Sequence, residues 1–278
     1  MALTSVKSAL ALATLLATSI SAIAADLPAA MPMKAPPPPG FSWTGFYLGG
    51  GGGGGMWNAD TNAVIDPIAG APFGGTVLTQ TTTNGGRGWL GTVTAGYDYQ
   101  FNNSWVIGAF GDVDFASISG TLNTGMATNF FNTLGGTETQ TGAWAVGGRV
   151  GWLVTPSILT YVNGGYTEAR FSSFAVDNLS TSPLMFGVGT PTGFTVNAHT
   201  YSGFFIGTGV ETTVPFLGKG WFVRSEYRYA QYEGATLPVL TQAGTNASIV
   251  AGIPLDVRLR PVVQTVRGEL TYKFDWGH

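Results

Sequence analysis

The sequence contains no cysteine and little charge, and each shortage excludes classes of protein. Without cysteine the chain has no disulfide, no thiol nucleophile and no Cys-ligated zinc or iron–sulfur site. Charged residues make up 10% of the chain, whereas soluble globular proteins average about 25%. The net charge of −3 lacks the basic surplus of a nucleic-acid-binding protein, so nucleic acid is excluded as a partner.

Long apolar segments are also scarce. Ala9–Ile23 is apolar and follows the positive charge of Lys7, but about 20 residues are needed to span a bilayer as a helix. The small residues Ala22 and Ala24 suit a signal-peptidase site, so we expect residues 1–24 to be a cleaved secretory signal peptide. No later apolar run approaches about 18 residues, so a membrane-embedded mature chain would have to be a closed β-barrel.

Proline is concentrated directly after the expected cleavage site. Residues 25–40 hold six prolines, which preclude a helix and favour an extended polyproline conformation. We therefore predict a stiff periplasmic tether over residues 25–42, and a disordered mature N-terminus fits the same composition. Further along, Gly49–Gly55 is a run of seven glycines. It lacks the following Lys-Ser/Thr of a phosphate-binding loop, and its role stays open.

From residue 43 onward, apolar and polar residues alternate with the period of two that is typical of β-strands. One face of each segment is broad and aromatic, and the other carries small residues and charges of both signs. This arrangement is the reverse of a soluble sheet and is typical of an outer-membrane barrel, with a soluble β-sandwich as the alternative. The eight segments are Trp43–Trp57, Arg87–Phe101, Ser104–Ile118, Thr141–Val154, Ile158–Phe171, His199–Val214, Trp221–Glu233 and Val262–Trp276.

These segments predict an all-β fold for residues 43–278, an eight-stranded antiparallel up-and-down transmembrane β-barrel. Short links alternate with four long ones, residues 59–86, 119–140, 172–198 and 235–260, which we expect to be extracellular loops. Aromatic residues beside the short links would form one interfacial girdle, and those at the other end a second. The first set is Trp43, Phe101, Trp105, Trp152, Trp221 and Trp276, and the second is Trp57, Trp89, Trp144 and Tyr201.

The charged residues of the small-residue face are predicted to form a salt-bridge network in the lumen. Asp112 and Asp114 share this face as a carboxylate pair that acid–base catalysis could use, but the facing arginines favour ion pairing. His199 and Ser202 are three residues apart, so they point to opposite faces of a strand. We predict no enzyme, no metal site and no cofactor. The predicted network consists of Asp112, Asp114, Arg149, Glu211, Arg224, Glu226, Arg228, Arg267, Glu269 and Lys273.

Four motifs, in this order along the chain, resemble those of small porin-family outer-membrane proteins of alphaproteobacteria, of the surface-antigen type. Two positions depart from the family pattern. Phe110 stands where the family often has an inward glutamate, and Glu269 stands where glycine is usual. The motifs are Trp43–Gly49 after a run of prolines, Gly207–Glu211, Glu226–Tyr229 and Tyr272–Trp276.

The resemblance implies a location in the outer membrane of a Gram-negative cell, among outer-membrane lipid and lipopolysaccharide. It implies insertion by the outer-membrane barrel assembly machinery, which recognises a last strand with alternating aromatics, here Tyr272, Phe274 and Trp276. It also implies that a mature N-terminus beginning Ala-Asp can be joined covalently to peptidoglycan. Ala25 is then the expected attachment point.

Three functions agree with such a barrel. Eight strands enclose an interior just wide enough for side chains to fill, which favours a structural protein that contributes to envelope integrity and surface architecture. The first alternative is a narrow porin-like diffusion channel for small solutes. The second is a surface-binding protein or adhesin that acts through its loops.

Overall fold

The computed structural model describes residues 42–65, 75–124, 134–178, 191–250 and 253–274. The expected signal peptide, and the expected tether apart from Ser42, lie outside the described residues. In the ranges that are described, no helix is long and apolar enough to cross a membrane.

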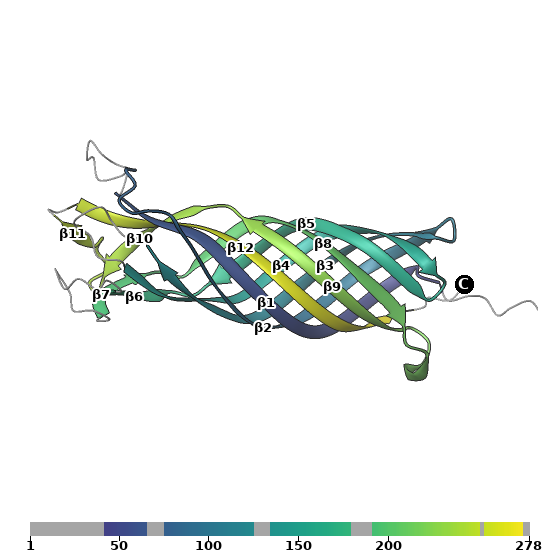
Figure 1. Ribbon diagram of the computed structural model, residues 1–278. Coiled ribbons are helices and arrows are strands. Elements are labelled where there is room, and N and C mark those ends of the chain that lie inside the picture. The colour runs from purple at the N-terminus through teal and green to yellow at the C-terminus, as the bar shows by residue number, and fades with distance from the viewer. Residues whose placement is uncertain (1–41, 66–74, 125–133, 179–190, 251–252, 275–278) are drawn as a thin grey trace, which may run out of the picture. The chain divides into compact units, whose positions relative to one another are not determined.

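Across these ranges the chain forms twelve strands and one 3-10 turn, η2 (Pro215–Leu217) (Figure 1). Every strand pairs antiparallel with its neighbours. The strands are β1 (Gly45–Ile65), β2 (Thr82–Phe101), β3 (Trp105–Asn123), β4 (Leu134–Thr155), β5 (Ile158–Phe171), β6 (Phe174–Asn178), β7 (Pro191–Val196), β8 (His199–Thr213), β9 (Trp221–Tyr232), β10 (Ala235–Thr241), β11 (Ser248–Val250) and β12 (Ile253–Lys273).

Eight of these strands close into a ring in the order β1-β2-β3-β4-β5-β8-β9-β12, and the pairing of β12 with β1 completes it. The register from Phe46 around all eight strands leads back to Met56, ten residues further along β1. A stagger of this size tilts the strands by roughly 40° to the barrel axis, and the inclined strands are visible in Figure 1. The predicted eight-stranded antiparallel barrel is therefore confirmed.

Several strands continue well past their predicted ends, so the expectation of four long loops was wrong in part. β1 runs on to Ile65, β2 begins at Thr82 and β4 begins at Leu134. Within the expected loops 172–198 and 235–260, β6, β7, β10 and β11 are further strands. These stretches are rich in Thr, Asn and Gly, which is why their composition suggested loops.

The extended strand ends form a second closed ring of eight strands, in the order β1-β2-β3-β4-β6-β7-β10-β12. We call this ring the collar; it comprises β6, β7 and β10 with residues 58–65, 82–86, 118–123, 134–140 and 253–261. Its interior is mostly apolar, as in a soluble barrel, and the polar side chains of Thr61, Glu138 and Gln140 are also buried there. The inward residues include Ala59, Ala63, Leu122, Phe174, Val176, Val196, Leu237, Val239, Val257 and Leu259.

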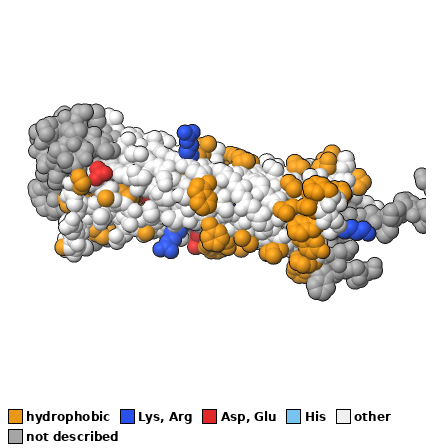
Figure 2. Space-filling model, turned by 90° about the horizontal axis from the view of Figure 1, so that it is seen from below, with side chains coloured by type: hydrophobic (Ala, Val, Ile, Leu, Met, Phe, Trp, Pro, Cys, Tyr) orange, Lys and Arg blue, Asp and Glu red, His pale blue; other side chains and the backbone are white. Residues whose placement is uncertain are grey.

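The outer wall below the collar carries the expected lipid-facing side chains. Figure 2 shows hydrophobic side chains gathered near one end of the barrel and again around its middle, with single basic side chains beside the second group. Exposed apolar residues, mostly valine, isoleucine and leucine, lie between the two aromatic bands, as in the apolar belt of outer-membrane barrels. The lower band includes Tyr99, Trp105, Trp152 and Phe274, and the upper band includes Trp89, Phe115, Trp144 and Phe204.

Three aromatic residues predicted for these girdles lie inside the barrel instead. Trp43 is fully buried, and its Nε1 donates to the carbonyl oxygen of Pro156. Trp57 is also buried and donates from Nε1 to the carbonyl oxygen of Ile118 at 2.8 Å. Tyr201 is the third. Their placement in the girdles was therefore wrong, and Trp276 lies outside the described residues.

The run of glycines lets β1 pass unusually close to β12. A Cβ atom on Gly51 would lie 1.9 Å from the carbonyl oxygen of Gly268, and one on Gly53 would lie 2.0 Å from that of Val266. Since no side chain fits at such distances, glycine is required at both positions.

Candidate functional site

All ten predicted network residues point into the barrel and are buried. They occupy alternate positions on their strands, because side chains two residues apart in a strand share a face. Asp112 and Asp114 lie on β3, Arg149 on β4 and Glu211 on β8. The remaining residues are Arg224, Glu226 and Arg228 on β9 and Arg267, Glu269 and Lys273 on β12.

The lower part of the network surrounds Arg149. Its Nε donates to Asp98 Oδ1 at 2.8 Å, and its Nη1 donates to Glu211 Oε2 at 2.9 Å. Lys273 Nζ lies 2.7 Å from Asp98 Oδ2, and Arg224 Nη2 lies 3.1 Å from Glu211 Oε2. These contacts join β2, β4, β8, β9 and β12 across the lumen.

Asp98 was not among the predicted network residues. The alternation of β2 placed it on the inward face, so that signal was present in the sequence. Its partners Arg149 and Lys273 are 51 and 175 residues away, and only the barrel register brings them together.

The upper part of the network centres on Arg267. Its Nη2 lies 2.6 Å from Glu226 Oε1 and 3.2 Å from Asp112 Oδ2, and its Nη1 lies 3.2 Å from Asp114 Oδ1. Arg228 Nη2 also contacts Asp112 Oδ2, at 2.7 Å. The pair Asp112 and Asp114 is thus engaged by arginine, as expected for a structural ion-pair cluster.

Glu269 links the two parts of the network. Its Oε2 lies 3.5 Å from Arg224 Nη1, and its Oε1 lies 3.5 Å from Arg267 Nε. Neither oxygen accepts a hydrogen bond among the described residues. In this part of the chain, the ion pairs therefore connect Lys273 and four arginines with six carboxylates as one continuous cluster.

Aromatic rings pack against the cations of the network. The guanidinium carbons of Arg149 and Arg224 each lie 4.8 Å from the ring centroid of Tyr47. Lys273 Nζ lies 4.5 Å from the ring of Trp43, which explains why this tryptophan is buried rather than facing lipid. Such contacts are attractive and strongest where water is excluded.

Phe110, the departure from the family pattern, belongs to the upper aromatic layer. Its ring centroid lies 6.0 Å from that of Phe205, and the Arg228 guanidinium carbon lies 4.2 Å from the Phe205 ring. Above this layer Trp57 packs edge to face on Phe171. Apolar side chains thus continue the filling of the lumen from the charged network to the collar.

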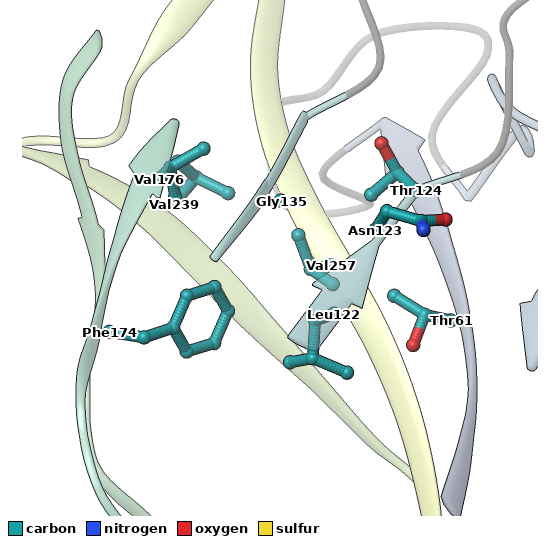
Figure 3. A pocket seen from close by; sticks show the side chains of 9 residues that line it. All are labelled: Thr61, Leu122, Asn123, Thr124, Gly135, Phe174, Val176, Val239 and Val257. Carbon is teal, nitrogen blue, oxygen red and sulfur yellow. The ribbon is translucent and has the colours of Figure 1, made fainter. Parts of the chain in front are cut away.

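Side chains of the collar interior line a small cavity. Its volume is about 10 Å³ (Figure 3), which is room for about one water molecule. The residues that line it are Thr61, Leu122, Asn123, Thr124, Gly135, Phe174, Val176, Val239 and Val257.

Two features of the described residues bear on chemistry, the arrangement of possible metal ligands and the contacts of His199. No group of three or more His, Asp and Glu side chains there is arranged to hold a metal ion. His199 packs edge to face on Tyr201, with ring centroids 4.7 Å apart.

The residues expected to direct assembly lie on the outer face of β12 and just beyond it. The rings of Tyr272 and Phe274 pack edge to face with centroids 5.1 Å apart, and Tyr272 also contacts Trp221. Trp276 and the expected peptidoglycan attachment point Ala25 lie outside the described residues.

Comparison with known proteins agrees with this architecture. No family model matches the chain. The chain is similar to the 31 kDa outer-membrane immunogenic proteins of Brucella melitensis biotype 1 and Brucella suis biovar 1. Each is 29% identical over 226 residues, which cover 75% of this chain and 80% of the relative.

A crystal structure of the outer membrane protein OprG from Pseudomonas aeruginosa has a similar fold. It matches with a TM-score of 0.52 and 13% identity over 84% of this chain and 99% of that one. The expected resemblance to outer-membrane surface antigens and the expected location are thus confirmed. The chain is an outer-membrane β-barrel protein.

Proposed function

We propose that this protein is a closed structural barrel that contributes to the integrity and surface architecture of the envelope. The observation that carries the proposal is the filled lumen, in which a continuous salt-bridge network lies below an apolar core. A solute would have to displace both layers in turn.

The energetics of the network argue against the alternative of a diffusion channel. Removing one partner of a buried ion pair typically costs about 3–5 kcal/mol, because the other charge is left uncompensated. Arg267 alone contacts four carboxylates, those of Asp112, Asp114, Glu226 and Glu269. Moving it aside to open a path would break several pairs at once.

The collar supports a role in surface architecture. β1 continues for nine residues beyond Met56, to Ile65, which places the far end of the collar roughly 20 Å beyond the upper aromatic band at the strand rise and tilt of such barrels. Its apolar core and closed ring of strands make it a rigid platform. Loop-mediated binding of a surface partner would take place on this platform.

We further propose that Ala25 joins the barrel covalently to peptidoglycan. This proposal rests on the family resemblance and on the proline-rich composition of the tether. Residues 26–39 in a polyproline conformation would reach roughly 40 Å, and strand one begins at the end that carries the short turns.

Two experiments test these proposals separately. Proteoliposomes that contain the refolded mature protein should not swell in small sugars faster than empty liposomes, and faster swelling would contradict the closed lumen. For the anchor, sacculi are digested with muramidase and searched by mass spectrometry for Ala25 peptides that carry muropeptide. Recovery of Ala25 solely with a free amine would refute the anchor while leaving the closed barrel intact.

A further inference from the structure

The lipid-facing wall carries a groove of about 500 Å³ at its upper part. It runs along the outside of β1, between β2 on one side and β12 with β9 on the other. Gly54 forms its floor, Met56 and Arg87 lie at its outer end, and Tyr227, Gln264 and Val266 form the opposite wall. The groove spans the level of the upper aromatic band, where Trp89 lies on β2.

A missing side chain creates this groove. Even-numbered residues of β1 face outward, and Leu48 and Met56 are exposed there as expected. A Cβ atom on Gly54 would meet nothing closer than the carbonyl oxygen of Gly88 at 3.6 Å, an ordinary contact. Packing therefore does not require glycine at position 54, unlike at Gly53.

Glycine in a lipid-facing strand carries a cost. It weakens a strand through its conformational freedom and offers no apolar surface to the bilayer. Because the backbone geometry does not demand Gly54, the open space above it is the feature that needs explaining. An apolar chain from outside the protein would fill it.

The outer end of the groove carries a positive charge. Arg87 pairs with Met56 across the ladder and lies two residues beyond Trp89 on β2. The side chain is exposed and forms no ion pair among the described residues. Aromatic bands mark the membrane interface, so the guanidinium lies at the height of lipid headgroups.

We propose that this groove binds lipopolysaccharide, with one acyl chain of lipid A above Gly54 and a lipid A phosphate held by Arg87. Lipid A combines the two required features, a phosphate at the interface and acyl chains directly below it. Guanidinium binds phosphate in a bidentate manner. The outer leaflet, which contains lipopolysaccharide, is the leaflet next to this end of the barrel. The inference is independent of whether the lumen conducts.

The test measures binding of purified lipid A to the refolded mature protein in detergent by native mass spectrometry. Gly54→Leu fills the groove and Arg87→Gln removes the charge, and each should weaken binding by about tenfold. Heat-modifiability on gels verifies that each variant folds. If Gly54→Leu fails to fold, Met56→Trp at the outer end of the same groove replaces it.

Two control variants lie outside the groove. Arg170 is exposed and pairs with Gly142, two residues beyond Trp144 of the upper band, so Arg170→Gln removes a charge at the same level of another wall. Gly148 faces outward with its nearest atom 3.7 Å from a built Cβ, so Gly148→Leu adds the same bulk elsewhere. Both should change affinity by no more than about twofold, as expected for a surface group without a specific contact.

The outcomes separate the alternatives. Lipid A without phosphates should bind more weakly and show no further loss with Arg87→Gln. An equal loss for Arg87→Gln and Arg170→Gln would show a general interfacial attraction and would overturn the site. Phosphatidylglycerol that binds as tightly as lipid A, with the same sensitivity to both groove variants, would overturn the assignment to lipopolysaccharide.

Discussion

Lys273 Nζ lies 2.7 Å from Asp98 Oδ2, so the last membrane strand is tied to the second one through the lumen. β1 separates these two strands in the ring. The ion pair therefore lies on the lumen side of the glycine-rich strand β1, whose own side chains contribute little to closing the barrel.

This relationship makes Lys273 a test of barrel stability. Lys273→Met should lower the free energy of unfolding by about 3–5 kcal/mol, because Asp98 would be left buried with one cation partner fewer. Urea titrations in lipid, monitored by tryptophan fluorescence, measure the loss of unfolding free energy. Lys219→Met, in the exposed turn before β9, is the matched control and should change little. Equal effects of the two variants would count against the network.

The geometry of Glu211 and Glu269 predicts unequal roles. Glu211 accepts hydrogen bonds from Arg149 and Arg224, whereas Glu269 is held at 3.5 Å without one. Hydrogen bonds to charged groups contribute about 1.5–3 kcal/mol. Glu211→Gln should therefore destabilise the barrel more than Glu269→Gln in the same urea titration, and the reverse order would contradict this picture.

Adjacent glycines of β1 should respond in opposite ways. Gly53→Ala places a Cβ 2.0 Å from a backbone oxygen of β12, whereas Gly54→Ala meets an ordinary contact. We expect Gly53→Ala to abolish the heat-modifiable folded form on gels. Gly54→Ala should fold like the wild-type protein. Normal folding of Gly53→Ala would show that β1 and β12 are further apart than described.

The collar contains a buried acid whose contribution to the stability of the fold depends on pH. Glu138 lies six residues beyond Trp144 of the upper band, and burial raises its pKa to about 8. The unfolded chain loses this proton near the ordinary pKa of 4.5, so stability should fall as pH rises from about 5 to 8. Thermal midpoints across this range should show the slope, and Glu138→Gln should flatten it. An unchanged slope in Glu138→Gln would assign the effect to another group.

The terminal aromatics should matter for assembly. Phe274 is 44% exposed on the lipid face, and β12 must pair with β1 to close the barrel. Replacing Phe274 and Trp276 together by serine should leave the secreted chain in the periplasm, as fractionation followed by immunoblotting would show. Wild-type amounts in the outer membrane would mean that the signal lies elsewhere.

The alternation of the sequence carries the signal for which charged residues face the lumen, although Asp98 was left out of the predicted network. Arg149 and Arg224 each have aromatic or β-branched neighbours one residue away, and this contrast identifies the inward face. The prediction failed for Trp43 and Trp57, because the glycines between them carry no side chains and reveal no face. Tyr201 is separated from Phe205 and Glu211 by even numbers of residues, so the alternation already placed its side chain on the inward face.

The collar could not be predicted for a different reason. Beyond the membrane the solvent is water, so apolar residues such as Val257 and Leu259 face inward and the polar ones face outward. The pattern thus reverses within single strands such as β12. The ion-pair partners were likewise inaccessible, because the pairing of Lys273 with Asp98 depends on the stagger of the whole ring.

The central claim is that the lumen is closed, and single-channel conductance tests it most directly. The refolded mature protein in planar bilayers should give no discrete current steps. A variant that combines Arg224→Ala, Arg267→Ala, Glu211→Ala and Glu226→Ala should also give no steps if it folds, because the aromatic layer and the apolar core of the collar still fill the lumen above the network. Reproducible steps of one size from the wild-type protein would contradict the account and would identify a channel.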